Sequence, residues 1–451
     1  MARKSSKLDP VTFEVLKNSF VNLVDQMAEV IFRTCYSFAI YARDFSSCLT
    51  DANADTVAQG SGDIAVHVGT LHFTTKTCMD VIGKDNLYQG DVILFNDPYT
   101  GGTHFCDVRA VRPVFHEDEL VAFTVCNGHW SDVGGSTPGS FDINASEHYG
   151  EGMRITPVKL VEKGVVNKPL LKMLTSNMRV SWEREGDFRA QVEATRIGEQ
   201  YLHSLINKYG KDVVLAAFKE NMDYVERMMR SEVSKFKSGT YEAEDFLDKD
   251  PKKEEGLVRI HVKMTIKGDE VLYDLTKSDP PVNCFLNSTF SSSFSAVVAG
   301  TKTFFPHVPL NSGFYRVVKM KLPENSCVNA PEPYAATGFC SGSYEKIMNS
   351  VYHCWSQVMP DRALACGFNL EYFLMGGIDT RPGYENRQFI YYDYQTGGWG
   401  GRQGRDGVHL MPSFGVGLMN LPTEPIERPP STLKHVPVMK EASSETRNIT
   451  A

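Results

Sequence analysis

The sequence has no apolar run that approaches the roughly 20 residues of a membrane-spanning helix. Its opening, MARKSSKLDP, is basic but leads into polar sequence instead of the apolar core of a signal peptide. We therefore expect a cytoplasmic protein that does not bind membranes. An excess of positive charge is also missing, because the formal net charge is -8 and the lysines and arginines are scattered. Without a basic stripe to neutralise phosphates, nucleic acid is not an expected partner.

Common signatures of structural and catalytic sites are missing as well. The ten cysteines include no CxxC pair, which argues against a zinc ribbon or a disulfide framework and favours buried, hydrophobic cysteines. The sequence has no GxxxxGK[ST] phosphate loop and no GxSxG nucleophile elbow. The glycine-rich segment at 397–407, GGWGGRQGRDG, lacks the strand-then-helix context of a nucleotide fingerprint. We therefore do not expect this chain to hydrolyse ATP by itself.

What the chain does have is enough apolar material for several domains, with 42% hydrophobic residues in a length of 451. Asp9-Pro10, followed by apolar residues at helical spacing as far as Ile31, predicts a long amphipathic helix. The overall pattern predicts a mixed α+β, multi-domain fold with antiparallel-rich sheets and long amphipathic helices. Three regions are expected: an α+β region with the metal-site loops (1–169), a helical region packed on it (170–240) and a β-rich C-terminal domain (241–451).

Residue types that bind metals are concentrated in two segments, NDPYTGGTHFCDV from residue 96 and CNGHWSDVGGSTPGS from residue 126. In each segment a histidine precedes an aspartate by three positions, as His104 precedes Asp107 and His129 precedes Asp132. Residues three apart on a turn can face the same way, so each pair offers an imidazole nitrogen and a carboxylate oxygen to one ion. The strand-like residues between the segments predict an antiparallel hairpin, which would bring both pairs to one edge of a sheet.

The alternative is that these pairs are ordinary. HxxD pairs arise by chance in a chain with 12 histidines, and Asp, Asn and Gly are common turn residues. If the pairs do bind an ion, the N,O ligand set suits zinc, manganese or iron without choosing between them. Asp51, Asp55, Asp63 and His67 form a further polar patch, in which the segment DANAD (51–55) is interpreted as a hairpin turn.

Six segments of the first half resemble, in the same order, the motifs of the hydantoinase B/oxoprolinase family. They are DPVTFEVLKNSF, ARDFSSCLTDA, NDPYTGGTHFCDV, GHWSDVGGSTPGS, EGMRITPVKL and GDFRAQVEA. In the second half, SDP at 278–280, LNSG at 310–313 and PTEPIE at 422–427 continue the match. The resemblance spans nearly the whole chain and raises the metal interpretation well above chance.

The resemblance implies an enzyme that works in a hetero-oligomer. A hydantoinase A-type, ATP-binding partner uses ATP and Mg²⁺ to phosphorylate the oxygen of a cyclic amide or a ketone, and the subunit that this chain resembles completes the reaction. In hydrolases of hydantoins, 5-oxoproline and other lactams, a water activated by a divalent metal would attack the carbonyl carbon. In the related acetone and acetophenone carboxylases, an enol phosphate attacks CO₂ derived from bicarbonate. Hydrolysis of a cyclic amide is the leading expectation, and carboxylation is the alternative.

The resemblance also implies a ligand set for one divalent transition metal, zinc or manganese with iron as a further option. By motif, the ligands are Asp44 of RDFS, His104 and Asp107 of THFCD, and His129 of GHWSD. Asp132 is then a carboxylate that orients His129 or the attacking water, with the role of general base as the alternative. His129 and Asp132 are accordingly the expected catalytic residues.

Two departures from the family pattern affect these expectations. Trp130 stands where many relatives have a second histidine, which we expect to alter the substrate pocket. After PIERPPSTLKHVPVMKE the family's usual glycine- and arginine-rich segment does not follow, so that part is expected on another polypeptide, or the chain is a short member. A third hypothesis is a non-catalytic assembly subunit, against which the intact histidines and aspartates weigh. An aromatic-rich pocket would favour the carboxylase, and the candidate residues are Trp130, Phe141, Trp399, Tyr391, Tyr392 and Tyr394.

Overall fold

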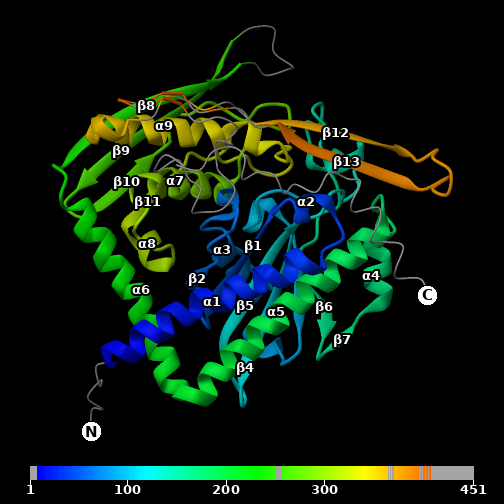
Figure 1. Ribbon diagram of the computed structural model, residues 1–451. Coiled ribbons are helices and arrows are strands. Elements are labelled where there is room, and N and C mark those ends of the chain that lie inside the picture. The colour runs from blue at the N-terminus through cyan, green and yellow to red at the C-terminus, as the bar shows by residue number, and fades with distance from the viewer. Residues whose placement is uncertain are drawn as a thin grey trace. The chain divides into compact units, whose positions relative to one another are not determined.

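A seven-stranded sheet is the largest element of the computed structural model, which describes residues 8–248, 256–363 and 370–395 and scattered positions between 365 and 407. In spatial order its strands are β2 (Thr56–Gln59), β1 (Phe45–Asp51), β5 (Glu119–His129), β4 (Asp107–His116), β3 (Val92–Phe95), β6 (Val158–Glu162) and β7 (Val165–Val166). Each strand runs antiparallel to its neighbours. The predicted hairpin between the two polar segments is confirmed as β4 and β5, joined by Glu117 and Asp118 (Figure 1).

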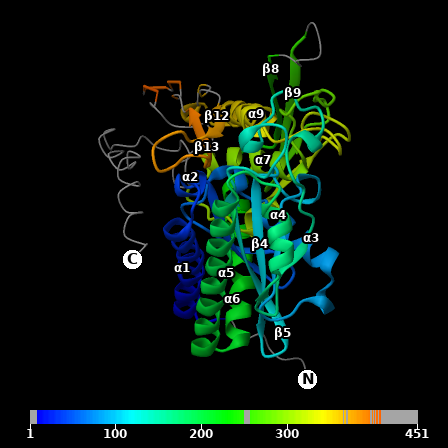
Figure 2. The same ribbon diagram turned by 90° about the vertical axis from the view of Figure 1, so that its right-hand side faces the viewer.

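Helices cover both faces of this sheet. α1 (Pro10–Thr34) and α5 (Ser181–Tyr209) lie side by side on one face, and α3 (Leu71–Ile82) packs on the other (Figure 2). α1 begins as predicted, because the Asp9 side chain accepts a hydrogen bond from the N–H of Thr12 at 2.9 Å and Pro10 occupies the first helical position. Since helices lie on both faces, the central strands β4 and β5 are almost wholly buried, including the polar residues Asp107, Arg109 and Arg112 of β4.

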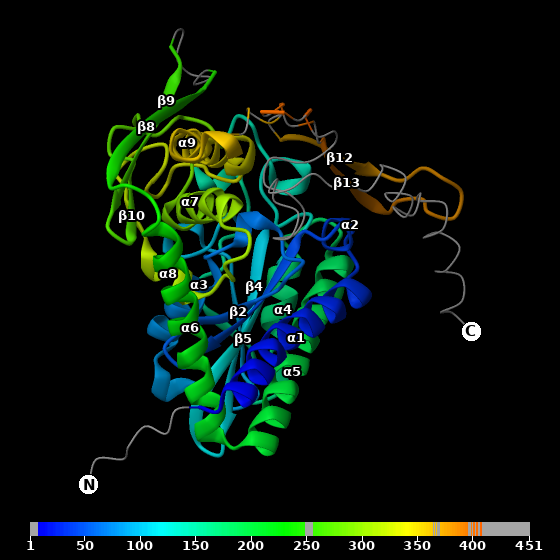
Figure 3. The ribbon, with the colours of Figure 1, turned by 60° about the vertical axis from the view of Figure 1, so that its left-hand side comes forward.

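A four-stranded sheet forms a second centre of packing. Its strands, in the order β11 (Val318–Lys321), β10 (Glu270–Asp274), β9 (Val258–Lys267) and β8 (Gly239–Leu247), include the predicted hairpin that turns at Gly268. α6 (Lys211–Val233) follows α5 and reaches this sheet, and α9 (Ser343–Val358) packs on β8 and β9 with α7 (Phe290–Phe304) behind it (Figure 3). The shorter helices are α2 (Phe38–Tyr41), α4 (Lys168–Thr175) and α8 (Ser312–Val317).

The expected α+β architecture is confirmed, and the C-terminal region contains two long helices besides its strands. α7 and α9 lie inside it, and α7 is buried nearly all round. The division into three regions stays a prediction. Among the described residues, no helix combines the length and the apolar character needed to cross a bilayer.

A two-stranded hairpin completes the described chain. β12 (Glu371–Ile378) pairs with β13 (Gln388–Gln395), and the register places Leu374 opposite Tyr392. The inward-facing Tyr372, Leu374 and Tyr392 pack against the core beneath α1 and α5. The PTEPIE match, the C-terminal segment, Cys366, Trp399 and the side chain of Tyr394 lie outside the described residues.

Candidate metal centre

The two polar segments predicted to converge do meet at one end of the β4–β5 hairpin. Asp107 opens β4 and His129 closes β5, and the two residues are direct cross-strand partners. His104, in the loop before β4, places its Nε2 3.1 Å from Oδ2 of Asp107. All three side chains are buried. Their proximity follows from local sequence, because a hairpin with a two-residue turn returns the chain to the end it left.

Asp44 reaches the same place from a distant part of the sequence. It precedes β1, which pairs with β5, and its backbone carbonyl accepts a hydrogen bond from the N–H of His129 at 3.0 Å. Arg43, just before it, has a positive φ of 72° that turns the chain into the strand. Oδ2 of Asp44 consequently lies 3.4 Å from Nδ1 of His129. The structure thus brings together all four side chains that the family resemblance suggested.

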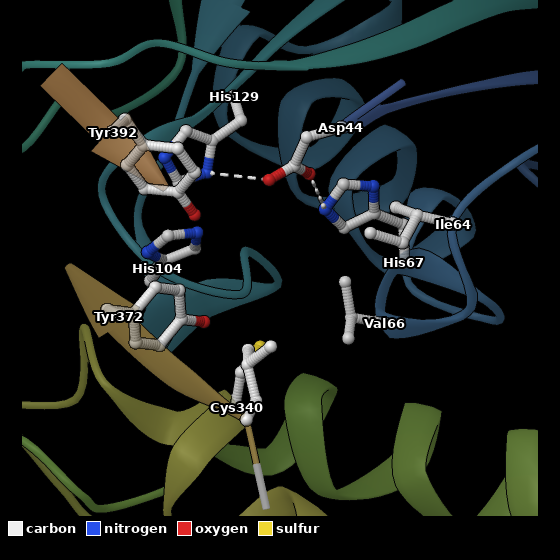
Figure 4. Close-up of a pocket in the computed structure, with 10 residues that line it drawn as sticks. Asp44, Ile64, Val66, His67, His104, His129, Cys340, Tyr372 and Tyr392 are labelled. Atoms are coloured by element: carbon white, nitrogen blue, oxygen red, sulfur yellow. Dashed lines mark ion pairs between the residues drawn. The ribbon is translucent and has the colours of Figure 1, made fainter. Parts of the chain in front are cut away.

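His67 is a fifth member of the cluster and was missed in the sequence. It ends the short 3₁₀ helix η1 (Ala65–His67), where its Nε2 lies 3.1 Å from Oδ1 of Asp107 and 3.9 Å from Oδ1 of Asp44 (Figure 4). Its flanking sequence, IAVHVG, does signal a buried imidazole, because apolar residues stand on both sides. What that imidazole faces depends on long-range packing. The DANAD segment of the same patch does form the predicted hairpin turn, between β1 and β2.

The five side chains fit a transition-metal ion. The donor atoms form two groups, and within each group all atoms lie within 4.8 Å of one another. The first group comes from His104, Asp107 and His129, and the second from Asp44, His67 and Asp107. Nε2 of His67, Nε2 of His104 and Nδ1 of His129 all face the carboxylates of Asp44 and Asp107, so nitrogen and oxygen donors converge on one place. Three imidazoles and two carboxylates suit zinc, manganese or iron. Asp107 is common to both groups and stands at the centre of the arrangement.

The charged groups of the cluster change one another's pKa. Burial raises the pKa of Asp44 to about 7, with His129 opposing this rise and Asp107 adding to it. Burial also disfavours ionisation of Asp107, but attraction to His104 and His67 outweighs it and holds the pKa of Asp107 well below the ordinary value. A divalent cation among these groups would favour the charged form of both carboxylates.

A small cavity of about 20 Å³ lies between the donor atoms and the β12–β13 hairpin. Asp44, His67 and His129 line one side of it, and His104 lies between Tyr372 and Tyr392 on the other (Figure 4). The other side is formed by Cys340, Leu370, Tyr372 and Tyr392, with Ile64 and Val66 beside His67. The volume holds an ion or one water molecule. A substrate therefore needs additional room, and the hydroxyl groups of Tyr372 and Tyr392 turn toward the cavity in Figure 4.

Asp132 is engaged elsewhere. Its Oδ1 accepts hydrogen bonds from the N–H groups of Gly134 and Arg179, and its Oδ2 accepts from the N–H of Gly139 and from the Arg179 guanidinium, at 2.9 to 3.0 Å. With both oxygens occupied in this way, the carboxylate is suited to holding the loop after His129. These contacts do not fit the general base or the orienting carboxylate expected from the sequence.

The aromatic candidates divide into those beside the cavity and those away from it. The ring of Tyr392 lies 4.9 Å from that of His129, and the ring of Phe141 lies 5.8 Å from that of His104. Trp130 is fully buried and donates its indole N–H to Gln191, so it belongs to the core and does not shape the pocket as expected. Tyr391 contacts Phe373 on the opposite face of the hairpin.

Comparison with known proteins places this geometry in context. A family model described as hydantoinase B/oxoprolinase matches residues 9–440. The chain is 33% identical over 440 residues to the B-type subunit of a putative D-/L-hydantoinase of Pseudomonas sp. (strain NS671), covering 93% of this chain and 73% of that protein. The crystal structure of the ATP-dependent caprolactamase of Pseudomonas jessenii superposes with a TM-score of 0.81 at 30% identity, covering 92% of this chain and 71% of that one. Nucleotide-free acetone carboxylase shares the fold at 19% identity, with a TM-score of 0.82 over 91% of this chain and 56% of that one.

Proposed function

Because the chain belongs to the hydantoinase B/oxoprolinase family, we propose that it is the metal-binding subunit of an ATP-dependent hydrolase of cyclic amides. The observation that carries this proposal is the convergence of Asp44, His67, His104, Asp107 and His129 on one small buried cavity. The similarity to an ATP-dependent caprolactamase supports a lactam, a hydantoin or 5-oxoproline as the substrate class. The metal is zinc or manganese, with iron as the further option.

The division of labour with a partner follows from the chemistry of the substrate. A lactam carbonyl is a poor electrophile, and phosphorylation of its oxygen makes the carbon easier to attack. The sequence has no phosphate loop, so the phosphorylation is assigned to a hydantoinase A-type partner that binds ATP and Mg²⁺. The similarity to one subunit of a putative D-/L-hydantoinase supports such a hetero-oligomer.

Within the site, the residues of this chain divide into donors and a covering layer. Asp44, Asp107 and the three histidines would hold the ion, which when bound supplies Lewis-acid polarisation and lowers the pKa of water. Tyr372 and Tyr392 close the cavity on the far side, where their hydroxyl groups can hydrogen-bond to oxygen atoms of the activated substrate. The apolar wall formed by Ile64 and Val66 helps to exclude bulk water.

A second candidate function is supported by the aromatic side chains beside the cavity. Tyr392 and Phe141 lie close to the histidine rings, and the ring centroids of Tyr372 and Phe141 lie 4.6 Å apart. An aromatic pocket suits a ketone such as an aryl ketone, whose enol phosphate would be carboxylated. The same metal site would then serve a subunit of an ATP-dependent ketone carboxylase.

The experiment that tests the function uses the full chain purified with a hydantoinase A-type partner. Metal content is measured first, and ATP turnover is then followed with lactams and hydantoins and, separately, with ketones plus bicarbonate. We expect stoichiometric metal and ring-opened product in the first series. Product that forms only with bicarbonate would replace the hydrolase with the carboxylase, and metal without turnover in either series would leave the assembly subunit as the conclusion.

A matched pair of variants tests the metal site itself. His104→Ala should lose the ion and the activity while the protein stays folded. His116→Ala removes a histidine from the far end of β4, next to the β4–β5 turn, and should keep both. Full metal occupancy in His104→Ala would remove His104 from the ligand set.

A further inference from the structure

A buried arginine lies directly behind the metal centre. Arg109 is two residues after Asp107 in β4, on the same face of the strand, and is fully buried. Its guanidinium is held by the carbonyl of Gly101 at 2.7 Å and by the hydroxyl of Thr70 at 3.1 Å, and it also donates to Thr74. The group is therefore anchored to the loop before β4 and to the start of α3.

Two further hydrogen bonds connect Arg109 to Asp107 through the side chains of Thr103 and Asn127. Nη2 donates to the hydroxyl oxygen of Thr103 at 2.9 Å, and Nε donates to Oδ1 of Asn127 at 3.2 Å. Thr103 in turn donates its hydroxyl hydrogen to Oδ2 of Asp107, and Nδ2 of Asn127 donates to Oδ1 of Asp107 at 3.1 Å. The four side chains form a closed ring in which one guanidinium backs both oxygens of one carboxylate.

The direction of each hydrogen bond in this ring is set by the arginine. A guanidinium has donors and no acceptor, so the oxygen atoms of Thr103 and Asn127 must face it. The single hydroxyl hydrogen of Thr103 is then left for Asp107, and the amide of Asn127 must turn its NH₂ toward Asp107. Without the guanidinium, the hydroxyl could rotate and the amide could flip.

We propose that Arg109 is a positioning residue for the metal centre, which fixes the carboxylate of Asp107 through Thr103 and Asn127 and thereby sets the affinity and geometry of metal binding. The inference rests on the proposed metal function. Asp107 belongs to both groups of donor atoms, so rotation of its carboxylate would change the donor positions in both groups. Loss of supporting groups of this kind lowers metal affinity about 10- to 100-fold.

The competing explanation is that Arg109 only supports the fold, and the same strand offers a control for it. Arg112 is also buried in β4 but faces α5, where it contacts Thr195 and Glu199. Arg112→Met therefore removes a buried arginine from the same strand without touching the ring around Asp107. Arg109→Lys keeps the positive charge but lacks the planar fork, which separates charge from geometry.

The test measures binding of Co²⁺ to the full chain by chelator competition and by the visible absorption spectrum of the bound ion. We expect Arg109→Met and Arg109→Lys to bind Co²⁺ about 10- to 100-fold more weakly with an altered spectrum. Arg112→Met and Thr103→Ser should match the wild type, and Thr103→Val should weaken binding. The double variant Arg109→Met/Thr103→Val should be no worse than Arg109→Met, because both changes break the same ring.

Each outcome separates the two proposals. Wild-type affinity and spectrum in the Arg109 variants would overturn the positioning role while leaving the metal site intact. Failure of the wild-type chain to bind Co²⁺, Zn²⁺ or Mn²⁺ would overturn the proposed function itself. If Arg109→Met does not fold, the Co²⁺ affinities of Thr103→Val and Thr103→Ser are compared instead. Equal affinity in these two variants would also overturn the positioning role.

Discussion

Asp107 lies directly opposite His129 across the β4–β5 hairpin. This pairing ties the two polar segments together through backbone geometry, so both side chains are positioned by the most buried part of the larger sheet. Asp44 joins them through the next strand of the same sheet, and His67 approaches from the loop after β2. Asp107 and His129 therefore stand on strand ends, whereas Asp44, His67 and His104 come from the segments before β1, after β2 and before β4.

The contribution of His67 is the first prediction. His67→Ala should weaken metal binding at least about 10-fold, because its Nε2 lies 3.1 Å from Oδ1 of Asp107 within one donor group. Titration calorimetry with Zn²⁺ measures the change. Gln59→Ala serves as a control in the same segment, since Gln59 is buried at the end of β2 and is not part of either donor group. Equal affinities in the two variants would exclude His67 from the ligand set.

The sequence predicted the parts of this site that depend on local structure. His104, Asp107 and His129 flank a hairpin whose strands and tight turn are visible in the sequence, so their convergence could be predicted from the topology. Asp44 could be placed only through the motif resemblance. His67 could not be placed, because its position depends on how η1 packs beneath α7, and such long-range contacts leave no local signal.

The missed helices of the second half have a related cause. α7 reads FSSSFSAVVAGTKTF, and every residue from Ser291 to Phe304 is buried. A helix with no exposed face has no charged stripe for solvent, and the buried serines and threonines of α7 make its apolar pattern harder to recognise than that of α1. Small residues such as Ser, Ala and Gly instead allow close packing against α9, where Gly300 meets Val351.

The second prediction concerns Asp132 and its role in the loop after His129. Asp132→Ala should lower the free energy of unfolding by about 3 kcal/mol, because it leaves buried N–H groups and the Arg179 guanidinium without their acceptor. Metal stoichiometry should be unchanged. Urea denaturation and metal analysis of the same sample measure both quantities. A stable variant without activity would restore Asp132 as a catalytic carboxylate.

The third prediction compares neighbouring tyrosines on the two faces of β13. Tyr392 is buried against His129, whereas Tyr391 contacts Phe373 on the other face. Tyr392→Ala should lower kcat/KM on the order of 10-fold, equivalent to about 1.4 kcal/mol of transition-state stabilisation, without loss of the ion. Tyr391→Ala should behave like the wild type. Equal kinetics for the two variants would show that the hairpin does not contact the substrate.

The last prediction follows from Glu151, a buried carboxylate that braces the loop leading to Cys340. Its oxygens accept hydrogen bonds from the N–H groups of Ala336 and Thr337 at 3.0 and 2.7 Å, yet burial outweighs them and raises its pKa from 4.5 to about 7. The folded state thus holds a proton that the unfolded chain releases, so this contribution to stability is complete below about pH 4.5 and is lost as the pH rises through 7. The stability advantage of the wild type over Glu151→Gln should shrink by at most about 3 kcal/mol between pH 4.5 and pH 8. Urea denaturation across this range measures it, with Glu147→Gln as a control that removes an exposed carboxylate nearby. A pH-independent difference between the wild type and Glu151→Gln would show that the pKa of Glu151 is the same in the folded and unfolded states.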